Sequence, residues 1–299
     1  MPDFDLSITI CSWNTLEDTR ACLASLEAVR HEANFEVILI DNNSEDGSPD
    51  MVAKEFPWVT LHRMAKNLGF TGGHNFALEN RNGRDALLLN SDTVVHPGAI
   101  ETIMAFSNAR PEVGIVGPRL HNPDGSLQPS CRKFPNPVAA IFRNTPIGRL
   151  FPNNSFTKAY LMEDWDHKSE REVDWVSGAA LLAKEDLIQK IGGLDPEYFM
   201  YCEDVDWCWR SWKAAMKVMY CPDAVITHAV GHSTDKAPNR MIGRHHKSML
   251  RFYKKNMIPE LPIVLRPLAL GAAYAFVGIR AGFFIAKNKR DDIVRRMRR

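Results

Sequence analysis

The chain has 299 residues, 45% of them hydrophobic and 24% charged, and a formal net charge of +1 at pH 7. These values are ordinary for a globular protein that forms one large domain, or one domain with an appendage, and they give no reason to expect a nucleic-acid partner. The basic charge is confined to residues 287–299, where seven Lys or Arg and two Asp give +5, so the first 286 residues sum to about −4.

The cysteines and the N-terminus indicate a reducing compartment. Six cysteines are scattered along the chain without a C-x-x-C pair, which argues against a disulfide framework or a structural zinc site. The N-terminus runs directly from Asp3 and Asp5 into a predicted strand, without a basic segment followed by an apolar one. We therefore predict no secretory signal and a cytoplasmic location.

The first 117 residues alternate between predicted strands and predicted helices. Apolar runs predict strands at 6–11, 35–40, 58–62 and 86–89, and apolar residues at helical spacing predict helices at about 15–30 and up to 56. The glycine-rich segment 67–75 is expected to be a loop that leads into a helix ending near Glu79. Such alternation implies a parallel α/β sheet with right-handed crossovers.

The alternation weakens after residue 117. Residues 118–172 are rich in Pro, Asn and charge, and we expect an irregular excursion over the edge of the sheet. Regular structure is predicted to return at 173–183, followed by a helix at 204–215 and two short strands at 218–220 and 224–227.

The C-terminal segment 261–286 is strongly apolar but contains Arg266, Pro267 and Arg280. A membrane span needs roughly 20 apolar residues, and the uninterrupted piece 267–279 is shorter. We therefore predict an amphipathic helix that lies in the headgroup plane, with its basic residues near anionic lipid. The alternative is a helix that packs on the body or forms a dimer contact.

Four polar clusters follow predicted strands or begin helices. Asn90-Ser91-Asp92 follows a buried strand, at the edge where open α/β sheets bind ligands, and its oxygens suit Mg²⁺ or Mn²⁺ holding a diphosphate. An ordinary turn with a helix cap is the alternative. The other three clusters are Cys11-Ser12-Trp13-Asn14, Asp41-Asn42-Asn43-Ser44 and Gly69–Asn75.

Two of these clusters suggest particular contacts. Asp41 can accept hydrogen bonds from a base or a ribose, or it is simply a turn residue. The glycine segment lacks the G-x-G-x-x-G pattern, so a nicotinamide cofactor is not expected, but Gly72 and Gly73 would let the backbone approach a ligand.

Further along the chain, Glu203 and Asp204 begin a predicted helix among aromatic residues. Burial among aromatics can raise the pKa of a carboxyl group to suit a general base, although acidic residues are also common in a first helical turn. His228 follows a strand, with His232 close behind, and is either structural or a metal ligand. His245 and His246 are expected at the surface.

Together these residues resemble the family 2 glycosyltransferases of GT-A fold, in particular the bacterial rhamnosyltransferase-like branch. The order and spacing agree over about residues 6–235. The matching motifs are Ser12-Trp13-Asn14, Asp41-Asn42-x-Ser44-x-Asp46-Gly47-Ser48, Asn67-x-Gly69-Phe70-x-Gly72-Gly73-x-Asn75, Asn90-Ser91-Asp92, Ser177-Gly178-Ala179, Glu203-Asp204 and His228-x-x-Gly231-x-Ser233.

The resemblance implies a role for each matching position. Asp41 would contact the nucleotide base, and Asp92 and His228 would bind Mn²⁺ or Mg²⁺, with Asn90 in place of the first Asp of the family's Asp-x-Asp motif. Asp204 would be the catalytic base. Further donor-binding residues would be Ser12, Asn14, Asn43, Asn67, Gly72, Gly73, Asn75, Asn90 and Ser91, and the acceptor would lie near Trp175, Ser177, Gly178, Glu203 and Trp207.

The resemblance also implies an α/β GT-A domain over 1–258, with a nucleotide-binding half (1–117) and an acceptor-side half (118–258), followed by a helical tail (259–299). The implied reaction is an inverting transfer of one sugar from a nucleotide-diphospho-sugar, deoxythymidine-diphospho-rhamnose or a uridine-diphosphate sugar. The acceptor would be a glycan or lipid-linked glycan at the inner face of the cell membrane, in polysaccharide synthesis.

The chain lacks one motif of the processive members of the family. Processive members carry Gln-x-x-Arg-Trp after the base, and the motif is missing here, so we expect one or very few sugars per encounter. The alternatives are a non-catalytic sugar-nucleotide-binding homologue at the membrane and a nucleotidyltransferase. The latter usually has a glycine-rich basic loop after the first strand, where this chain has Cys11-Ser12-Trp13-Asn14.

Overall fold

The computed structural model describes residues 2–136, 139, 142, 148, 150–229 and 238–297. The elements of the first 121 residues alternate largely as predicted. They are β1 (Phe4–Ser12), α1 (Leu16–Ala28), β2 (Phe35–Asp41), α2 (Ser48–Glu55), β3 (Thr60–Arg63), α3 (Gly69–Glu79), β4 (Gly83–Asn90), β5 (Thr93–Val95), α4 (Ala99–Asn108) and β6 (Val113–His121).

The described part of the second half of the domain contains several short strands, three helices and the long strand β12. Its elements are β7 (Leu127–Gln128), β8 (Cys131–Arg132), α7 (Ser155–Leu161), β9 (Arg171–Glu172), β10 (Trp175–Val176), β11 (Ala180–Ala183), α8 (Glu185–Ile191), α9 (Glu203–Lys213) and β12 (Lys217–His228). The remaining elements form the C-terminal helical unit, residues 238–297. They are α10 (Pro238–Phe252), the π-helical turn η1 (Tyr253–Met257), the 3₁₀ turns η2 (Ile258–Glu260) and η3 (Ile263–Leu265), and α11 (Arg266–Met297).

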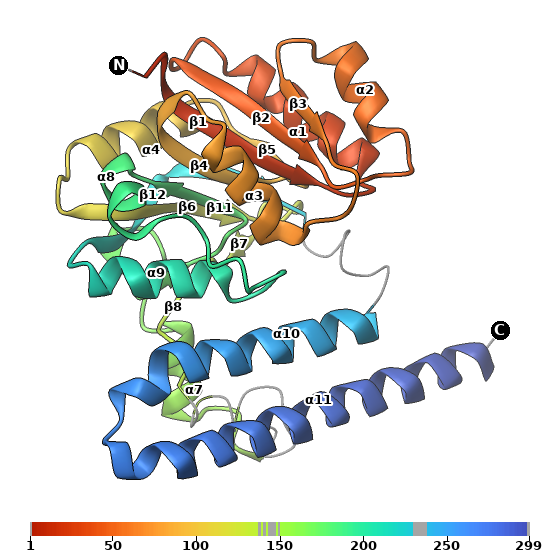
Figure 1. Ribbon diagram of the computed structural model, residues 1–299, viewed down its shortest axis with the longest axis vertical. Helices are drawn as coiled ribbons and strands as arrows, with labels where there is room; N and C mark the ends of the chain where they lie inside the picture. Colours follow the sequence, from red (N-terminus) through yellow and green to blue (C-terminus); the bar gives the residue numbers. More distant parts are fainter. Residues whose placement is uncertain are drawn as a thin grey trace.

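The central sheet has the strand order β3-β2-β1-β4-β11-β6-β12-β5 (Figure 1). Strands β3, β2, β1 and β4 are parallel, as are β6 and β12, whereas β11 runs antiparallel to both β4 and β6. The mostly parallel α/β sheet predicted from the sequence is therefore confirmed, with β11 inserted between its two parallel parts.

Strand β4 shows why the sheet is covered on both faces. Leu87 and Leu89 belong to a core shared with α1, α2 and α4, whereas Ala86 and Leu88 belong to a second core shared with α8, α9 and α10. Successive side chains of a strand point to opposite faces, so a strand covered by helices on both sides needs an unbroken apolar run.

The structure corrects two predicted elements. The glycine-rich segment 67–75 is not a loop, because α3 already begins at Gly69, whose φ is +78° and whose added Cβ would lie 2.3 Å from the Phe199 carbonyl oxygen. The two predicted strands at 218–220 and 224–227 are one strand, β12, with an irregularity between Cys221 and Val225. Pro222, which has no N–H for the ladder, lies in this irregularity.

The C-terminal helical unit extends beside the sheet domain as an antiparallel pair, α10 and α11 (Figure 1). Pro267 lies in the first turn of α11, where proline is tolerated, so the predicted interruption is not a break. By length and composition, the segment Ile263–Phe284 could span a membrane. Only 6% of its most apolar 18-residue stretch is buried in the protein. In α10, His246 is buried and not at the surface as predicted, and desolvation lowers its pKa.

Candidate active site

Three of the predicted polar clusters meet at one edge of the sheet. Ser12 ends β1 and lies in register with Asp41 at the end of β2, and Cys11 lies in register with Asn90 at the end of β4. Ligands of open α/β sheets bind at this carboxyl edge, so the strand order alone assembles the candidate site.

Asp41 has one carboxylate oxygen in a turn and one that is available to a ligand. The side chain is 2% exposed, and its Oδ2 accepts the Ser44 N–H at 3.0 Å. Its Oδ1 is buried without a hydrogen-bond partner among the described residues. A buried acceptor without a partner carries a desolvation cost that a bound donor group removes. Asn14 borders the same loop, and its Oδ1 accepts the Glu45 N–H at 2.7 Å.

Four buried hydroxyl groups fasten the start of α1 to the sheet. Ser12 Oγ lies 3.1 Å from Thr15 Oγ1 and 2.9 Å from Thr19 Oγ1, and Ser91 Oγ lies 3.1 Å from Thr15 Oγ1. Ser12 is fully buried. The structure thus places the Ser12 and Ser91 hydroxyls in contacts within the protein, in contrast to the predicted role of these residues in donor binding.

Gly72 and Gly73 of the glycine-rich motif each lie where a side chain would collide with a neighbour, and Gly73 lets α3 pack against β1. A Cβ on Gly73 would lie 2.3 Å from Cys11 Sγ, and one on Gly72 would lie 2.9 Å from Leu68 Cβ. Asn42, whose role the sequence did not reveal, donates to Cys11 Sγ at 2.8 Å and to the Gly69 carbonyl at 3.1 Å.

The side chains of the remaining asparagines predicted to bind the donor differ in how far they are already occupied by hydrogen bonds within the protein. Asn67 Oδ1 accepts the Gly69 N–H at 2.8 Å. Asn75 uses both ends of its amide on the backbone of Leu194, at 2.8 and 2.9 Å, and therefore holds a loop instead of facing a ligand. Asn43 is exposed at the rim with a φ of +63°.

Asp92 and His228, the two residues predicted to bind a metal, lie beside each other. His228 Nε2 lies 3.3 Å from Asp92 Oδ1, and the Asn90 amide nitrogen lies 3.2 Å from the same ring nitrogen. The structure describes no third His, Cys, Asp or Glu that would complete a metal-binding group. His232 and the rest of its motif, Gly231 and Ser233, lie outside the described residues.

Gln128, which the sequence analysis missed, determines the tautomer of His228. Its amide nitrogen donates to the His228 carbonyl at 3.1 Å and to Asn122 Oδ1 at 2.8 Å, so its Oε1 accepts the His228 Nδ1–H at 2.7 Å. With the proton on Nδ1, Nε2 carries the lone pair, which lies within reach of the Asn90 amide N–H at 3.2 Å and beside Asp92 Oδ1 at 3.3 Å. An imidazole nitrogen held in this way beside a carboxylate oxygen is a donor set that suits a divalent cation such as Mn²⁺.

Asp204 lies in the first turn of α9 with its carboxylate in a fixed orientation. Its Oδ2 accepts the Gly178 N–H at 3.0 Å, and its Oδ1 accepts the Val205 N–H at 2.8 Å. Desolvation raises the pKa of Asp204 despite these hydrogen bonds. Burial, together with the charge of Asp204, raises the pKa of Glu203 well above its usual value, and Glu203 Oε2 has no hydrogen-bond partner among the described residues. Glu203, which is buried, and Asp204, which is half-buried, therefore form a pair of adjacent carboxyl groups with raised pKa values.

The residues predicted near the acceptor fall into two groups. Ser177, Gly178 and Trp175 lie on or beside β10, close to the Asp204 carboxylate through Gly178. Trp207 is fully buried and donates from Nε1 to the Gly192 carbonyl at 3.0 Å, so it belongs to the core and does not line an acceptor site.

Arg132 is a further residue that the sequence did not reveal. It ends the two-residue strand β8, and its guanidinium lies 5.5 Å from the centre of the Trp175 ring. Its positive charge lowers the pKa of Asp204, opposing the effect of desolvation. This residue therefore adds a cation to the acceptor side of the site.

Two solved glycosyltransferases share this architecture. The mannosyltransferase PcManGT from Pyrobaculum calidifontis, solved in complex with GDP-Man and Mn²⁺, superposes with a TM-score of 0.54 and 17% identity, covering 98% of this chain and 83% of that one. Residues 1–349 of TarS from S. aureus superpose with a TM-score of 0.54 and 14% identity, covering 93% of this chain and 82% of that one. The fold is that of the GT-A glycosyltransferases.

Sequence comparison gives the family. Residues 2–249 match the family described as glycosyltransferase like family 2. An N-acetylglucosaminyl-diphospho-decaprenol L-rhamnosyltransferase of Mycobacterium tuberculosis is 34% identical over 241 residues, which cover 77% of this chain and 78% of that protein. The low-salt glycan biosynthesis hexosyltransferase Agl10 of Haloferax volcanii is 22% identical over 223 residues, covering 73% and 64%. The chain belongs to the family 2-like glycosyltransferases.

Proposed function

We propose that this glycosyltransferase moves one deoxyhexose, rhamnose, from a nucleotide-diphospho-sugar to a lipid-linked sugar with inversion at the anomeric carbon. The observation that carries the proposal is the Asp204 carboxylate, which is held by the Gly178 N–H and has a raised pKa. A pure sugar-nucleotide-binding protein has no need of such a base. The choice of rhamnose and of a lipid-linked acceptor is supported by the name of the 34% identical relative.

The donor would bind along the carboxyl edge of β1, β2 and β4. Asp41 Oδ1, which lacks a partner among the described residues, accepts a hydrogen bond from the base or ribose. Asp92 and His228 would hold the divalent cation. When bound, this cation neutralises negative charge on the departing diphosphate as a Lewis acid. Asp92 and His228 fit that role because Gln128 keeps the proton of His228 on Nδ1, which leaves Nε2 free to bind a cation beside Asp92 Oδ1.

Asp204 removes the proton from the acceptor hydroxyl as that oxygen attacks the anomeric carbon. One bond forms and one breaks on opposite faces of the sugar in a single displacement, which inverts the configuration. A base with a pKa above that of an ordinary aspartate retains more driving force for proton abstraction. The neighbouring Glu203 carboxyl would contact the acceptor.

The C-terminal helical unit would hold the enzyme at the inner face of the cell membrane. Large apolar side chains of η3 and α11 are well exposed, including Ile263, Val264, Leu268 and Ile279. A basic run follows them in the sequence, suited to anionic headgroups. This placement would bring a lipid-linked acceptor to the site from the membrane.

Calorimetric titration with a panel of nucleotide sugars, with and without Mn²⁺ or Mg²⁺, tests the donor site. We expect metal-dependent binding of one donor that is lost in Asp92→Ala. Product analysis by NMR with a short-chain lipid-linked acceptor then tests the reaction, and an inverted anomeric configuration is expected. Retention of configuration would contradict the mechanism, and binding without turnover of any donor and acceptor pair would favour a non-catalytic homologue.

A further inference from the structure

The carboxylate two residues beyond the proposed base is completely buried. Asp206 lies in the first turn of α9 with no exposed surface, and Arg210, one turn later, donates from Nε to its Oδ2 at 2.8 Å. A buried charge is tolerated only where it is paired and hydrogen-bonded. The identity of the partners therefore shows which parts of the molecule hold this turn of α9.

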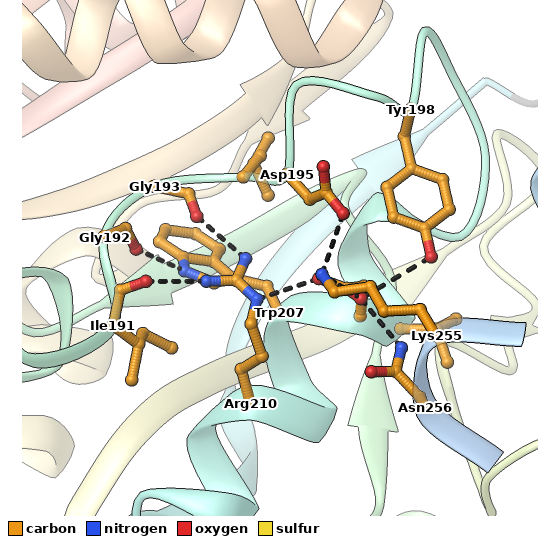
Figure 2. Close-up of polar contacts among 12 residues, drawn as sticks. Ile191, Gly192, Gly193, Asp195, Tyr198, Trp207, Arg210, Lys255 and Asn256 are labelled. Carbon is orange, nitrogen blue, oxygen red and sulfur yellow. Dashed lines mark hydrogen bonds and ion pairs between the residues drawn. The ribbon is translucent and has the colours of Figure 1, made fainter. Parts of the chain in front are cut away.

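Two of these partners come from the C-terminal helical unit (Figure 2). Lys255 Nζ lies 2.8 Å from Oδ1 and 3.0 Å from Oδ2 of Asp206, and Asn256 donates from Nδ2 to Oδ1 at 2.8 Å. Both residues lie in the π-helical turn η1. Turns of this kind are rare and are frequent at functional sites.

The same network includes the loop before α9 (Figure 2). Lys255 also contacts Asp195 Oδ2 at 2.8 Å, and Arg210 donates to the carbonyls of Ile191 and Gly193, each at 2.8 Å. Asn75 of α3 also binds this loop, through the backbone of Leu194. The start of α9 is thus fixed between the loop and the C-terminal helical unit.

We infer that Lys255 and Asn256 are positioning residues for the base, an inference that rests on the proposed role of Asp204. By holding Asp206 they fix the first turn of α9, and with it the direction of the Asp204 carboxylate toward Gly178 and the acceptor. Small displacements of a reacting group have large kinetic effects, because a misplacement of about 1 Å can cost about 100-fold in rate.

Hydrogen exchange tests the inference without any turnover. The Gly178 N–H donates to Asp204 Oδ2, so its exchange rate reports whether the carboxylate is in place. In Lys255→Met we expect exchange at Gly178 to be about tenfold faster, while amides of β1 keep their protection. The matched control is Lys213→Met, because Lys213 joins the other end of α9 to Glu260 of η2 through an exposed pair at 2.9 Å.

Steady-state kinetics provide the second readout. We expect Lys255→Met to lower kcat about 10- to 100-fold and to leave the donor Kd within about twofold, because the donor-binding residues are untouched. Asn256→Ala should act in the same direction with a smaller effect. In an Asp206→Asn background, Lys255→Met should lower kcat by a smaller factor than in the wild-type chain, because the part of its effect that acts through Asp206 is already lost and only its pair with Asp195 remains.

Unchanged Gly178 exchange together with unchanged kcat in Lys255→Met and Asn256→Ala would overturn the inference. Should Lys255→Met fail to fold, Asn256→Ala decides by the same two measurements, since it leaves Asp206 paired with Lys255 and Arg210. A wild-type chain that turns over no donor, but whose Gly178 exchange rises in the variants, contradicts the proposed function and leaves the positioning effect intact.

Discussion

The half-buried carboxyl group of Asp204 combines a pKa raised by desolvation with two backbone hydrogen bonds. Replacing it in Asp204→Asn keeps the shape of the side chain and removes the base. We expect kcat to fall about 10²- to 10⁴-fold and donor binding to stay unchanged, measured by release of the nucleoside diphosphate and by calorimetry. Asp186→Asn is the matched control, because Asp186 is an exposed acidic residue in the first turn of α8. Comparable kcat in Asp204→Asn and the control would rule out this base.

Arg132 gives a prediction about pH. Because desolvation raises the pKa of Asp204, we expect kcat to rise with pH along an acid limb above the range of an ordinary aspartate. The charge of Arg132 lowers the same pKa, so Arg132→Met should move this limb to higher pH. Arg171→Met is the control, because Arg171 lies over Trp165 in a similar way and pairs with Asp164. A limb that stays in place, or moves to lower pH, contradicts the assignment.

The raised pKa values of Glu203 and Asp204 also affect stability. The folded state binds their protons more tightly than the unfolded state does. The stabilising contribution of this pair to the free energy of unfolding is therefore fully present below the ordinary carboxyl pKa values. It is lost as pH rises through the raised folded values. The pair therefore destabilises the fold at neutral pH, as is usual where a functional site needs a buried charge.

Gln128 predicts an effect on metal affinity. In Gln128→Leu the His228 ring loses the acceptor that keeps the proton on Nδ1, and we expect Mn²⁺ affinity to fall about 10- to 100-fold in calorimetric titration with donor present. Gln189→Leu, which alters an exposed glutamine of α8, should leave affinity unchanged. Equal affinities of the two variants would remove Gln128 from the metal site.

At the scale of elements, the contact of α3 with β1 depends on a missing side chain. Gly73→Ala places a Cβ 2.3 Å from Cys11 Sγ, and we expect the free energy of unfolding to fall by about 1–3 kcal/mol in urea titrations. Adding Cys11→Ala should restore part of that loss. Gly243→Ala in α10 meets no atom within 4 Å and should be neutral or stabilising, by up to about 1 kcal/mol. Equal stability of Gly73→Ala and Gly243→Ala would contradict the packing role.

The individual strands and helices also show which features of the fold and the site the sequence predicts. The apolar run ending at Asn90 predicts a strand covered on both faces, and parallel strands bring their carboxyl ends together, so Asp41 and Asp92 could be expected at one edge. Periodicity does not tell whether a polar side chain faces a ligand or its own backbone. Asn75 therefore matched a binding motif although its amide is bonded to Leu194.

The site residues that the sequence did not reveal were unpredictable for a common physical reason. Gln128 and Arg132 lie on two-residue strands inside a segment rich in Pro and Asn, where no periodic pattern exists. Their roles depend on which distant residues the fold brings to them, His228 and Trp175. Trp207 shows the converse, because its aromatic motif suggested an acceptor contact and its side chain fills the core.

At the scale of the whole molecule, the exposed apolar residues of η3 and α11 predict membrane association. Deleting residues 261–299 should move the protein from the pellet to the supernatant in sedimentation with vesicles, with the larger effect on vesicles that contain anionic lipid. Leu268→Glu should weaken the same partition, while Glu101→Gln on α4 of the sheet domain should not. Unchanged partition of the deleted chain would mean that the tail packs on protein instead.

The network around Asp206 has a consequence for where the catalytic unit ends. The family match stops at residue 249, whereas Lys255 and Asn256 lie beyond it. A chain shortened to the matched region would keep every proposed substrate contact, yet it would leave Asp206 with Arg210 as its remaining charged partner. The smallest autonomous enzyme should therefore extend at least through Met257, and a soluble version is better sought by ending the chain between η2 and α11.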